Sequence, residues 1–359
     1  MAHHPLTTGA DAAWVTGERG WLLLRALLAG LVAIPLAACG PVGPPGGGPG
    51  ATSAPAIRSW PLVNYENDGY ATHTCSGTGA LSYAVLSPAH PGHYPVVFGI
   101  TGTAFSGSAG CLAGTRSPQF LSMQPLLSDW VRAGYVAVDI EYHGYANGLL
   151  GDTTYPGPGH WGQVADGTTQ LDIKPAIEHF LAHHPERYGA DPALGLVVFG
   201  TSSGAHDAYM LAVTGVPGVR LSAVVGWSGL PDASLAGGYA RYVFDRYMGT
   251  TAGSDIEAFG DPQHRVQPQM PLEYVANARW EFIDWRGSEA FASACQRLRV
   301  TTWLRVPASS AHAGAYAYYH FSGQPPELAY PTPPPGTTVI QDSITFASRA
   351  GHAVGPAVG

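Results

Sequence analysis

An apolar segment that ends in a Gly-Ser turn constrains the fold of this chain more than any other feature. Residues 194–204 have the sequence Leu-Gly-Leu-Val-Val-Phe-Gly-Thr-Ser-Ser-Gly. A short, continuously apolar run bounded by glycine is typical of a strand that is buried on both faces. Residues 205–213 are expected to form a helix directly after the turn. A strand, a tight turn and a helix in this order are typical of an α/β protein with a mostly parallel sheet.

The turn places a serine at the centre of a G-x-S-x-G pattern. Gly200, Ser202 and Gly204 occupy its three defined positions. A turn of this kind is strained and tight, so the residues two before and two after the serine must be small. The hydroxyl then stands at the carboxyl end of the strand, beside the first turn of the helix. We predict that Ser202 is a nucleophile; the alternative, in a chain of 47 glycines, is an ordinary Gly-Ser turn.

Predicted strands and helices alternate along the rest of the chain. Further strands are expected at residues 81–86, 94–100, 134–142, 221–227, 272–277 and 301–306. Helices are expected at residues 118–133, 171–184 and 288–298. This alternation predicts a mostly parallel sheet with helices on both faces.

An insertion rich in aromatic residues lies between Trp227 and Pro271. Its aromatic residues include Tyr239, Tyr242, Phe244, Tyr247 and Phe259. They are expected either to contact an apolar substrate or to pack against one another.

Three segments resemble the chain around the nucleophile in a known family. They are Asp172-Ile173-Lys174-Pro175-Ala176-Ile177-Glu178, Tyr188-Gly189-Ala190-Asp191-Pro192 and the strand Gly134-Tyr135-Val136-Ala137-Val138-Asp139-Ile140-Glu141-Tyr142. With the Gly-Thr-Ser-Ser-Gly turn, they are similar to the α/β-hydrolase fold, in particular to bacterial esterases related to hormone-sensitive lipase. The resemblance covers nearly all of residues 60–359. It implies a triad in the chain order serine, acid, histidine, and an insertion after strand six of the family's sheet.

Position singles out one of the 15 histidines as the base. The resemblance places the catalytic histidine on the loop after the last strand, where His312 lies. A neutral imidazole takes the proton of a serine hydroxyl and later gives it to the leaving group. His320 and His352 are the alternatives. His206, four residues after Ser202, is expected to pack on the helix instead.

The acid is expected among Glu273, Glu281, Asp284 and Glu289. Many members of the family end strand seven in His-Gly-x-x-Asp; here Asn277-Ala278 replaces His-Gly, and Glu281 replaces the aspartate. The span from Glu281 to His312 accommodates one helix and one strand. A glutamate suffices, because the acid only orients and stabilises the imidazolium. We predict Glu281, with Asp284 and Glu289 as alternatives, and a solvated surface carboxylate as the other interpretation of each.

An oxyanion hole needs backbone N–H groups aimed at the developing negative charge. One is expected from Ser203, directly after the nucleophile. The other is expected from Thr101-Gly102-Thr103-Ala104, where lipases and esterases of the family carry His-Gly-Gly-Gly. Gly102 and Thr103 are therefore candidates, with a plain glycine turn as the alternative. This chemistry needs neither a metal nor a cofactor.

The amino-terminal segment has the pattern of an export signal. Arg19 and Arg25 precede an apolar run at residues 26–38, a length that suits a signal peptide and is short for a membrane-spanning helix. The run ends in Leu36-Ala37-Ala38-Cys39-Gly40, which resembles a bacterial lipobox, so Cys39 is expected to be lipidated. An ordinary signal peptide or an uncleaved anchor is the alternative.

The expected organisation is a signal peptide at 1–38, a Pro/Gly-rich tether at 39–59 and a catalytic domain at 60–359. The protein is then expected outside the cytoplasm, anchored to the bacterial cell membrane through Cys39, or alternatively secreted.

Export also permits disulfides. Cys75, Cys111 and Cys295 remain beside the lipobox cysteine. A bridge between Cys75 and Cys111 is favoured, because both lie in Gly/Ser-rich segments early in the domain. None of the cysteines has the spacing of a zinc site.

The charge distribution argues against nucleic acid as a partner. The formal net charge is −8, Lys174 is the only lysine, and no basic stripe is present. The sequence predicts a serine hydrolase that acts on small-molecule or lipid esters, with no obligate protein partner. The alternatives are a non-catalytic surface-binding protein of this fold and a peptidase of this fold.

Overall fold

A ten-stranded sheet with a parallel centre organises the chain. The computed structural model describes residues 55–71, 79–105, 119–142, 168–248 and 260–353. The parallel strands are β4 (Val96–Ile100), β5 (Val136–Ile140), β6 (Leu196–Thr201), β7 (Ala223–Trp227), β8 (Leu272–Ala276) and β9 (Thr302–Val306). The antiparallel strands are β1 (Ile57–Ser59), β2 (Val63–Ala71), β3 (Gly79–Pro88) and β10 (Leu328–Tyr330). Their order is β1-β3-β5-β4-β6-β7-β8-β9-β10, with β2 paired to β3.

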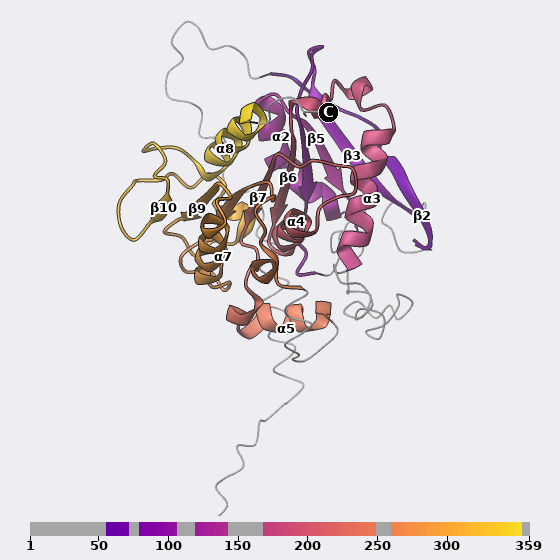
Figure 1. The fold of residues 1–359 in the computed structure, drawn as a ribbon. Helices are drawn as coiled ribbons and strands as arrows, with labels where there is room; N and C mark the ends of the chain where they lie inside the picture. The colour runs from indigo at the N-terminus through magenta and orange to yellow at the C-terminus, as the bar shows by residue number, and fades with distance from the viewer. Residues whose placement is uncertain (1–54, 72–78, 106–118, 143–167, 249–259, 354–359) are drawn as a thin grey trace, which may run out of the picture. The chain divides into compact units, whose positions relative to one another are not determined.

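Helices cover both faces of this sheet, as the alternation predicts (Figure 1). The described α-helices are α2 (Gln124–Arg132), α3 (Thr168–Ala182), α4 (Ser203–Thr214), α5 (Gly238–Met248), α7 (Trp285–Arg297) and α8 (Val339–Ala353). Short 3₁₀ helices lie at Gln119–Met123, Pro185–Tyr188, Pro192–Leu194, Ala233–Leu235, Pro262–Arg265 and Ala313–Tyr316. One buried apolar cluster joins one face to α3, α4 and α7, and a second joins the other face to α2 and α8.

The strand before the Gly-Ser turn, β6, is apolar from Leu196 to Phe199, and the clusters on its two faces explain why. Leu196 and Val198 of β6 belong to the cluster with α4, while Val197 and Phe199 belong to the cluster with α2 and α8. Successive side chains of a strand point to opposite faces. Because both faces are covered, every position of β6 is buried and favours an apolar residue.

The aromatic insertion forms a third, smaller cluster beyond the end of the sheet. Ala240, Val243 and Phe244 of α5 pack there against Phe105 and Leu230, which follow β4 and β7. In Figure 1, α5 lies apart from the helices that cover the sheet. The insertion therefore builds a wall over the loops at the carboxyl end of the parallel strands.

The structure corrects several expected boundaries. The helix expected at 118–133 is α-helical only in α2, because Pro125 near its start favours the first turn of a helix. The helix expected at 288–298 begins at Trp285, because the Asp284 carboxylate accepts the Arg286 N–H over 2.9 Å and caps it. β1 lies within residues 39–59, expected to be tether, so the sheet begins before residue 60.

The expected signal peptide at 1–38, Cys39, and the Cys75–Cys111 bridge lie outside the described residues. Cys295, the third cysteine, is buried in α7 with a free thiol. Ala54–Gly359 forms one compact unit, and the unit Met1–Ser53 contains no described residue. Within the described ranges, no helix has both the length and the apolar character needed to cross a membrane.

Candidate active site

Ser202 occupies a strained turn between β6 and α4. Its φ is 54° and its ψ is −125°, and α4 begins at the next residue. A Cβ on Gly200 would lie 2.1 Å from the carbonyl oxygen of Gly204, and one on Gly204 would lie 2.2 Å from that of Ile100. Neither position can hold a side chain without moving backbone. The expectation that both flanking positions must be small is confirmed.

The structure brings His312 to Ser202 across 110 residues of chain. His312 lies in the loop after β9, with its Nε2 2.8 Å from Ser202 Oγ. Its Nδ1 makes a short hydrogen bond with Glu281 Oε2. The carboxylate only accepts, so the imidazole proton lies on Nδ1 and Nε2 is left to accept the serine proton. The three side chains form one continuous hydrogen-bonded chain.

The Glu281 carboxylate is held on both oxygens and has no exposed surface. Its Oε1 accepts the Ala278 N–H over 2.7 Å and lies 2.8 Å from the Ser228 hydroxyl. Oε2 is thereby turned toward the imidazole of His312. A replacement of His-Gly-x-x-Asp by Asn277-Ala278-x-x-Glu thus still directs a carboxylate to the histidine.

The other candidate acids lie elsewhere. Asp284 caps α7 and pairs with Arg286 over 3.1 Å. Glu289 lies on α7, in its second turn from the cap. Glu273 is wholly buried in β8, and burial raises the pKa of its carboxyl well above the usual range.

Two further histidines, His320 and His206, make other contacts. His320 contacts the carbonyl oxygen of Gly336 over 2.9 Å. His206 is fully buried on α4, where its Nδ1 lies 2.8 Å from Leu230 O and burial lowers its pKa to about 4. Its expected packing role on the helix is confirmed by its edge contact with Phe105 at 5.1 Å between ring centroids. The side chain of His352 lies outside the described part of the chain.

The loop after β4 lies directly against the nucleophile. A Cβ on Gly102 would be 2.4 Å from the Cβ of Ser202. The Gly102 N–H donates to Thr201 Oγ1 over 3.1 Å, and the Thr103 N–H donates to Ser203 Oγ over 2.8 Å. Both loop amides expected in the oxyanion hole are therefore paired with side chains in this structure. The Ser203 N–H is at the first helical position, where a helix offers no intrahelical acceptor.

The strand ends that carry these residues are joined by backbone hydrogen bonds. The Ser202 N–H donates to Trp227 O over 2.7 Å, and the Ser228 N–H donates to Ala276 O over 2.7 Å. The Asn277 N–H then donates to Arg305 O over 3.0 Å. Strands β7, β8 and β9 thus each fix the first residue of the loop that leaves the strand before them in the sheet order.

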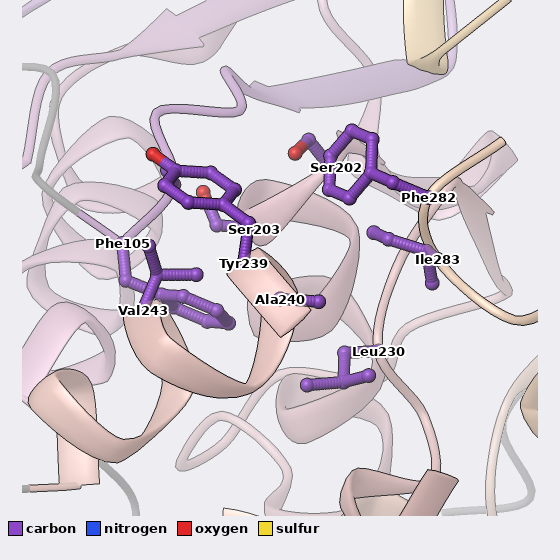
Figure 2. A pocket seen from close by; sticks show the side chains of 10 residues that line it. Phe105, Ser202, Ser203, Leu230, Tyr239, Ala240, Val243, Phe282 and Ile283 are labelled. Atoms are coloured by element: carbon purple, nitrogen blue, oxygen red, sulfur yellow. The ribbon is translucent and has the colours of Figure 1, made fainter. Parts of the chain in front are cut away.

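A small apolar pocket opens beside Ser202 (Figure 2). Tyr239, Ala240 and Val243 project into it from α5, and Figure 2 shows Phe282 close to Ser202. Its remaining lining residues are Ala104, Phe105, Ser203, Leu230 and Ile283. Its cavity volume is about 30 Å³, room for about two water-sized groups.

Phe282 covers the base as well as the pocket. Its ring centroid lies 4.5 Å from that of His312, and its side chain is 52% exposed. Tyr239 meets it edge-on at 6.2 Å. Among the described residues, no group of three or more His, Cys, Asp or Glu side chains is placed to hold a metal ion.

The strand order, the strained turn at Ser202 and the positions of the loops that carry Glu281 and His312 define an α/β-hydrolase fold. No protein-family model matches the sequence, and no curated protein matches it. Solved structures with this fold are similar at low sequence identity. Esterase B from Lactobacillus rhamnosis (HN001) has a TM-score of 0.52 at 14% identity, over 80% of this chain and 81% of its own. An esterase rPPE variant complexed with (S)-Ac-CPA has a TM-score of 0.53 at 18% identity, over 91% and 86%.

A further similar structure belongs to a bifunctional GH43-CE protein of Bacteroides eggerthii. Its TM-score is 0.59 at 18% identity, over 81% of this chain and 38% of that longer chain. These structural neighbours share the fold, and two of the three are esterases by name.

Sequence reasoning missed two residues of the site, Ser228 and Phe282. Ser228 directly follows the strand after the nucleophile strand, and Phe282 directly follows Glu281. Adjacency to a candidate acid is the one signal that points to Phe282. No local pattern distinguishes Ser228 from other serines.

Proposed function

We propose that the protein is a serine hydrolase that cleaves carboxylic esters through an acyl-enzyme on Ser202. The hydrogen-bonded chain from Ser202 through His312 to Glu281, at the end of a strained turn, carries the proposal. A serine hydroxyl alone is a weak nucleophile; here it has a base, and the base has a carboxylate. The esterases that share the fold support an activity on esters.

In the first half of the reaction, Ser202 Oγ attacks the ester carbonyl carbon and its proton passes to His312 Nε2. Glu281 keeps the imidazole oriented and stabilises the imidazolium. The carbonyl oxygen takes up the electron pair, and His312 returns the proton to the leaving alcohol as the C–O bond breaks. Water then attacks the acyl-enzyme, His312 takes a proton from it, and the carboxylic acid leaves Ser202 with that proton restored to Oγ.

Backbone amides stabilise the negative charge on the carbonyl oxygen. The Ser203 N–H supplies one donor, and Gly102 and Thr103 are the candidates for the other. The Thr103 amide becomes available when the Ser203 hydroxyl turns away from it. A preorganised donor of this kind contributes about 3–4 kcal/mol to transition-state stabilisation.

The substrate proposed is an ester with a short, apolar acyl group. The pocket beside Ser202 has an apolar wall from α5 and room for about two water-sized groups. An acyl chain of a few carbons fits this space, whereas a long chain must displace Val243 or Phe282. The alcohol part of the substrate leaves on the open side of Ser202.

Labelling with a fluorophosphonate probe tests the proposal. The probe is expected to label the purified protein and to fail with Ser202→Ala, because the probe reacts only with an activated serine. Failure to label correctly folded protein contradicts the proposal and favours a non-catalytic binding protein of this fold. Turnover of peptide amides in preference to p-nitrophenyl esters favours a peptidase instead.

The location proposed is the outer side of a bacterial cell membrane, with residues 1–38 as signal peptide and Cys39 as the lipidated residue. The residues from Cys39 up to β1 then tether the catalytic domain. The lipobox-like Leu36-Ala37-Ala38-Cys39 supports this arrangement. Cys39→Ala is expected to move the protein from the membrane fraction to the soluble fraction of an expressing bacterium. Unchanged membrane association in that variant contradicts the lipid anchor.

A further inference from the structure

Ser228 lies behind the acid, at the end of the strand beside the nucleophile strand. It directly follows β7, and it is completely buried. Its φ is 54°, in the left-handed region that a serine rarely adopts. A non-glycine residue is held in such a conformation only where its surroundings determine it, and such residues gather at functional sites.

The hydroxyl of Ser228 meets three partners from two loops. Its Oγ lies 2.8 Å from Glu281 Oε1 and 2.9 Å from the Tyr316 hydroxyl. It also accepts the Ala313 N–H over 2.8 Å. An ionised carboxylate only accepts hydrogen bonds, so the single proton of Ser228 goes to Glu281. The lone pairs of Oγ then accept the Ala313 N–H and can accept the Tyr316 hydroxyl, whose single proton has Ala276 O as its other acceptor.

Tyr316 completes this hydrogen-bond network. Its side chain is buried, and burial raises the pKa of its hydroxyl well above the usual value, so it remains a donor. It lies 3.1 Å from Ala276 O, the same carbonyl oxygen that accepts the Ser228 N–H. The backbone and the hydroxyl of Ser228 are therefore fixed by one set of groups.

We propose that Ser228 is a positioning residue that keeps the Glu281 carboxylate and the His312 imidazole correctly placed relative to each other. Its hydroxyl fixes the Glu281 carboxylate on one side and, through Ala313, the residue next to His312 on the other. This inference rests on the proposed function. Without the hydroxyl, Oε1 keeps only the Ala278 N–H and the carboxylate rotates more freely. At the same time, the loop that carries His312 loses a hydrogen bond.

Two substitutions at Ser228 separate the hydroxyl from the backbone. Ser228→Ala removes the hydroxyl and keeps the strained φ, whereas Ser228→Gly removes the hydroxyl and relieves the strain, since glycine adopts positive φ readily. Both are expected to lower kcat on a p-nitrophenyl ester about 10- to 100-fold, as expected for a lost hydrogen bond to a charged group. KM is expected to stay within about twofold, because the residue does not line the substrate pocket.

Proton NMR gives a readout that a purely structural role would not move. The proton shared by His312 Nδ1 and Glu281 is expected to give a far-downfield resonance in the wild-type protein. In both Ser228 variants this resonance is expected to broaden or move upfield. Circular dichroism and thermal melting establish that each variant is folded.

Ser222→Ala is the matched control. Ser222 is also buried and precedes the same strand, but its hydroxyl accepts the Leu196 N–H at the opposite end of the sheet. Its kcat and its downfield resonance are expected to match the wild type.

Full activity and an unmoved resonance in Ser228→Gly would overturn the positioning role. Loss in Ser228→Ala with recovery in Ser228→Gly would also overturn it, since only backbone strain then matters. An inactive wild type, or an active Ser202→Ala, would instead refute the proposed function itself.

Discussion

Ala104 and Phe105 beside the pocket have positive φ without being glycine, and so do three residues that lie directly at the hydrogen-bonded site. Ser202 and Ser228 have φ of 54°, and Ala313 has φ of 49°. Each such residue costs about 1–3 kcal/mol that the surrounding structure must offset. The flanking glycines mark the strained turn at Ser202 in the sequence. Ser228 and Ala313 are strained by hydrogen bonds from distant loops, so no local pattern predicts them.

Replacing the acid tests the assignment of Glu281 at the same scale. Glu281→Gln is expected to lower kcat about 10²- to 10⁴-fold, because an amide stabilises the imidazolium poorly and disturbs its tautomer. The fold is expected to survive, as monitored by circular dichroism. Asp284→Asn and Glu289→Gln are the matched controls and are expected to keep wild-type kcat. Activity in Glu281→Gln with loss in either control would move the acid role to that residue.

Glu273 makes stability depend on pH. Its folded-state pKa is raised above the ordinary value of 4.5 by burial in β8. The folded protein therefore keeps a proton that the unfolded chain releases. The contribution to stability is complete below the ordinary pKa and is lost as pH rises from there toward the folded-state pKa.

Glu273→Gln is expected to remove this dependence. Between about pH 5 and pH 9, the Tm of the wild type is expected to fall more steeply than that of the variant. Thermal melts at matched ionic strength measure both slopes. Glu289→Gln, at a residue with part of its surface in solvent, is the control and should keep the wild-type slope. Identical slopes in wild type and Glu273→Gln would contradict the prediction.

At the scale of elements, the buried parallel strands are the most predictable part of the fold. Their continuous apolar runs reflect coverage on both faces, a property that the sequence carries directly. The antiparallel strands β1, β2 and β10 were missed, because β1 and β10 have only three residues each and the nine residues of β2 are largely polar. The helices α5 and α8 were also missed, although Ala240, Val243 and Phe244 recur at helical spacing.

The carboxy-terminal helix α8 is tied to the sheet by a buried ion pair. Arg305 in β9 meets Asp342 in α8 over 2.5 Å, and both side chains are almost wholly buried. Asp342→Ala leaves the guanidinium buried without its carboxylate and is expected to cost about 3–5 kcal/mol of unfolding free energy. Urea denaturation measures the change. Arg132→Ala, which breaks a half-exposed pair with Asp129, is expected to cost less than about 1 kcal/mol. Similar costs for the two variants would contradict a special contribution of the buried pair.

At the scale of the whole molecule, chain order predicted which candidate residues would meet. The α/β-hydrolase resemblance fixed where the serine, the acid and the histidine should fall, and Ser202, Glu281 and His312 do lie in hydrogen-bond contact. The pairing of the Gly102 and Thr103 amides with side chains was not predictable. It depends on the rotamers of Thr201 and Ser203, which only tertiary packing sets.

The wall of the acyl pocket is assembled from distant segments, and its depth should control chain length. Val243→Ala on α5 enlarges the pocket, so it is expected to raise kcat/KM for hexanoate relative to acetate esters about 10-fold, the effect of one or two methylenes in an apolar pocket. A panel of p-nitrophenyl esters measures the ratio. Val300→Ala, the same truncation in the core just before β9, is the control and should leave the ratio unchanged. An unchanged ratio in Val243→Ala would place the acyl group elsewhere.

The backbone hydrogen bonds that join the strand ends have a consequence for how this site tolerates change. Ser202, Ser228 and Asn277 each take their position from the neighbouring strand rather than from the loop that follows. A change in the length of one loop therefore does not shift the first residue of the next, although the Ser228 hydroxyl still links the loops that carry Glu281 and His312. The parts of these loops that carry neither Glu281 nor His312 can diverge in length and composition, and accept new substrates, while the strand ends keep their positions.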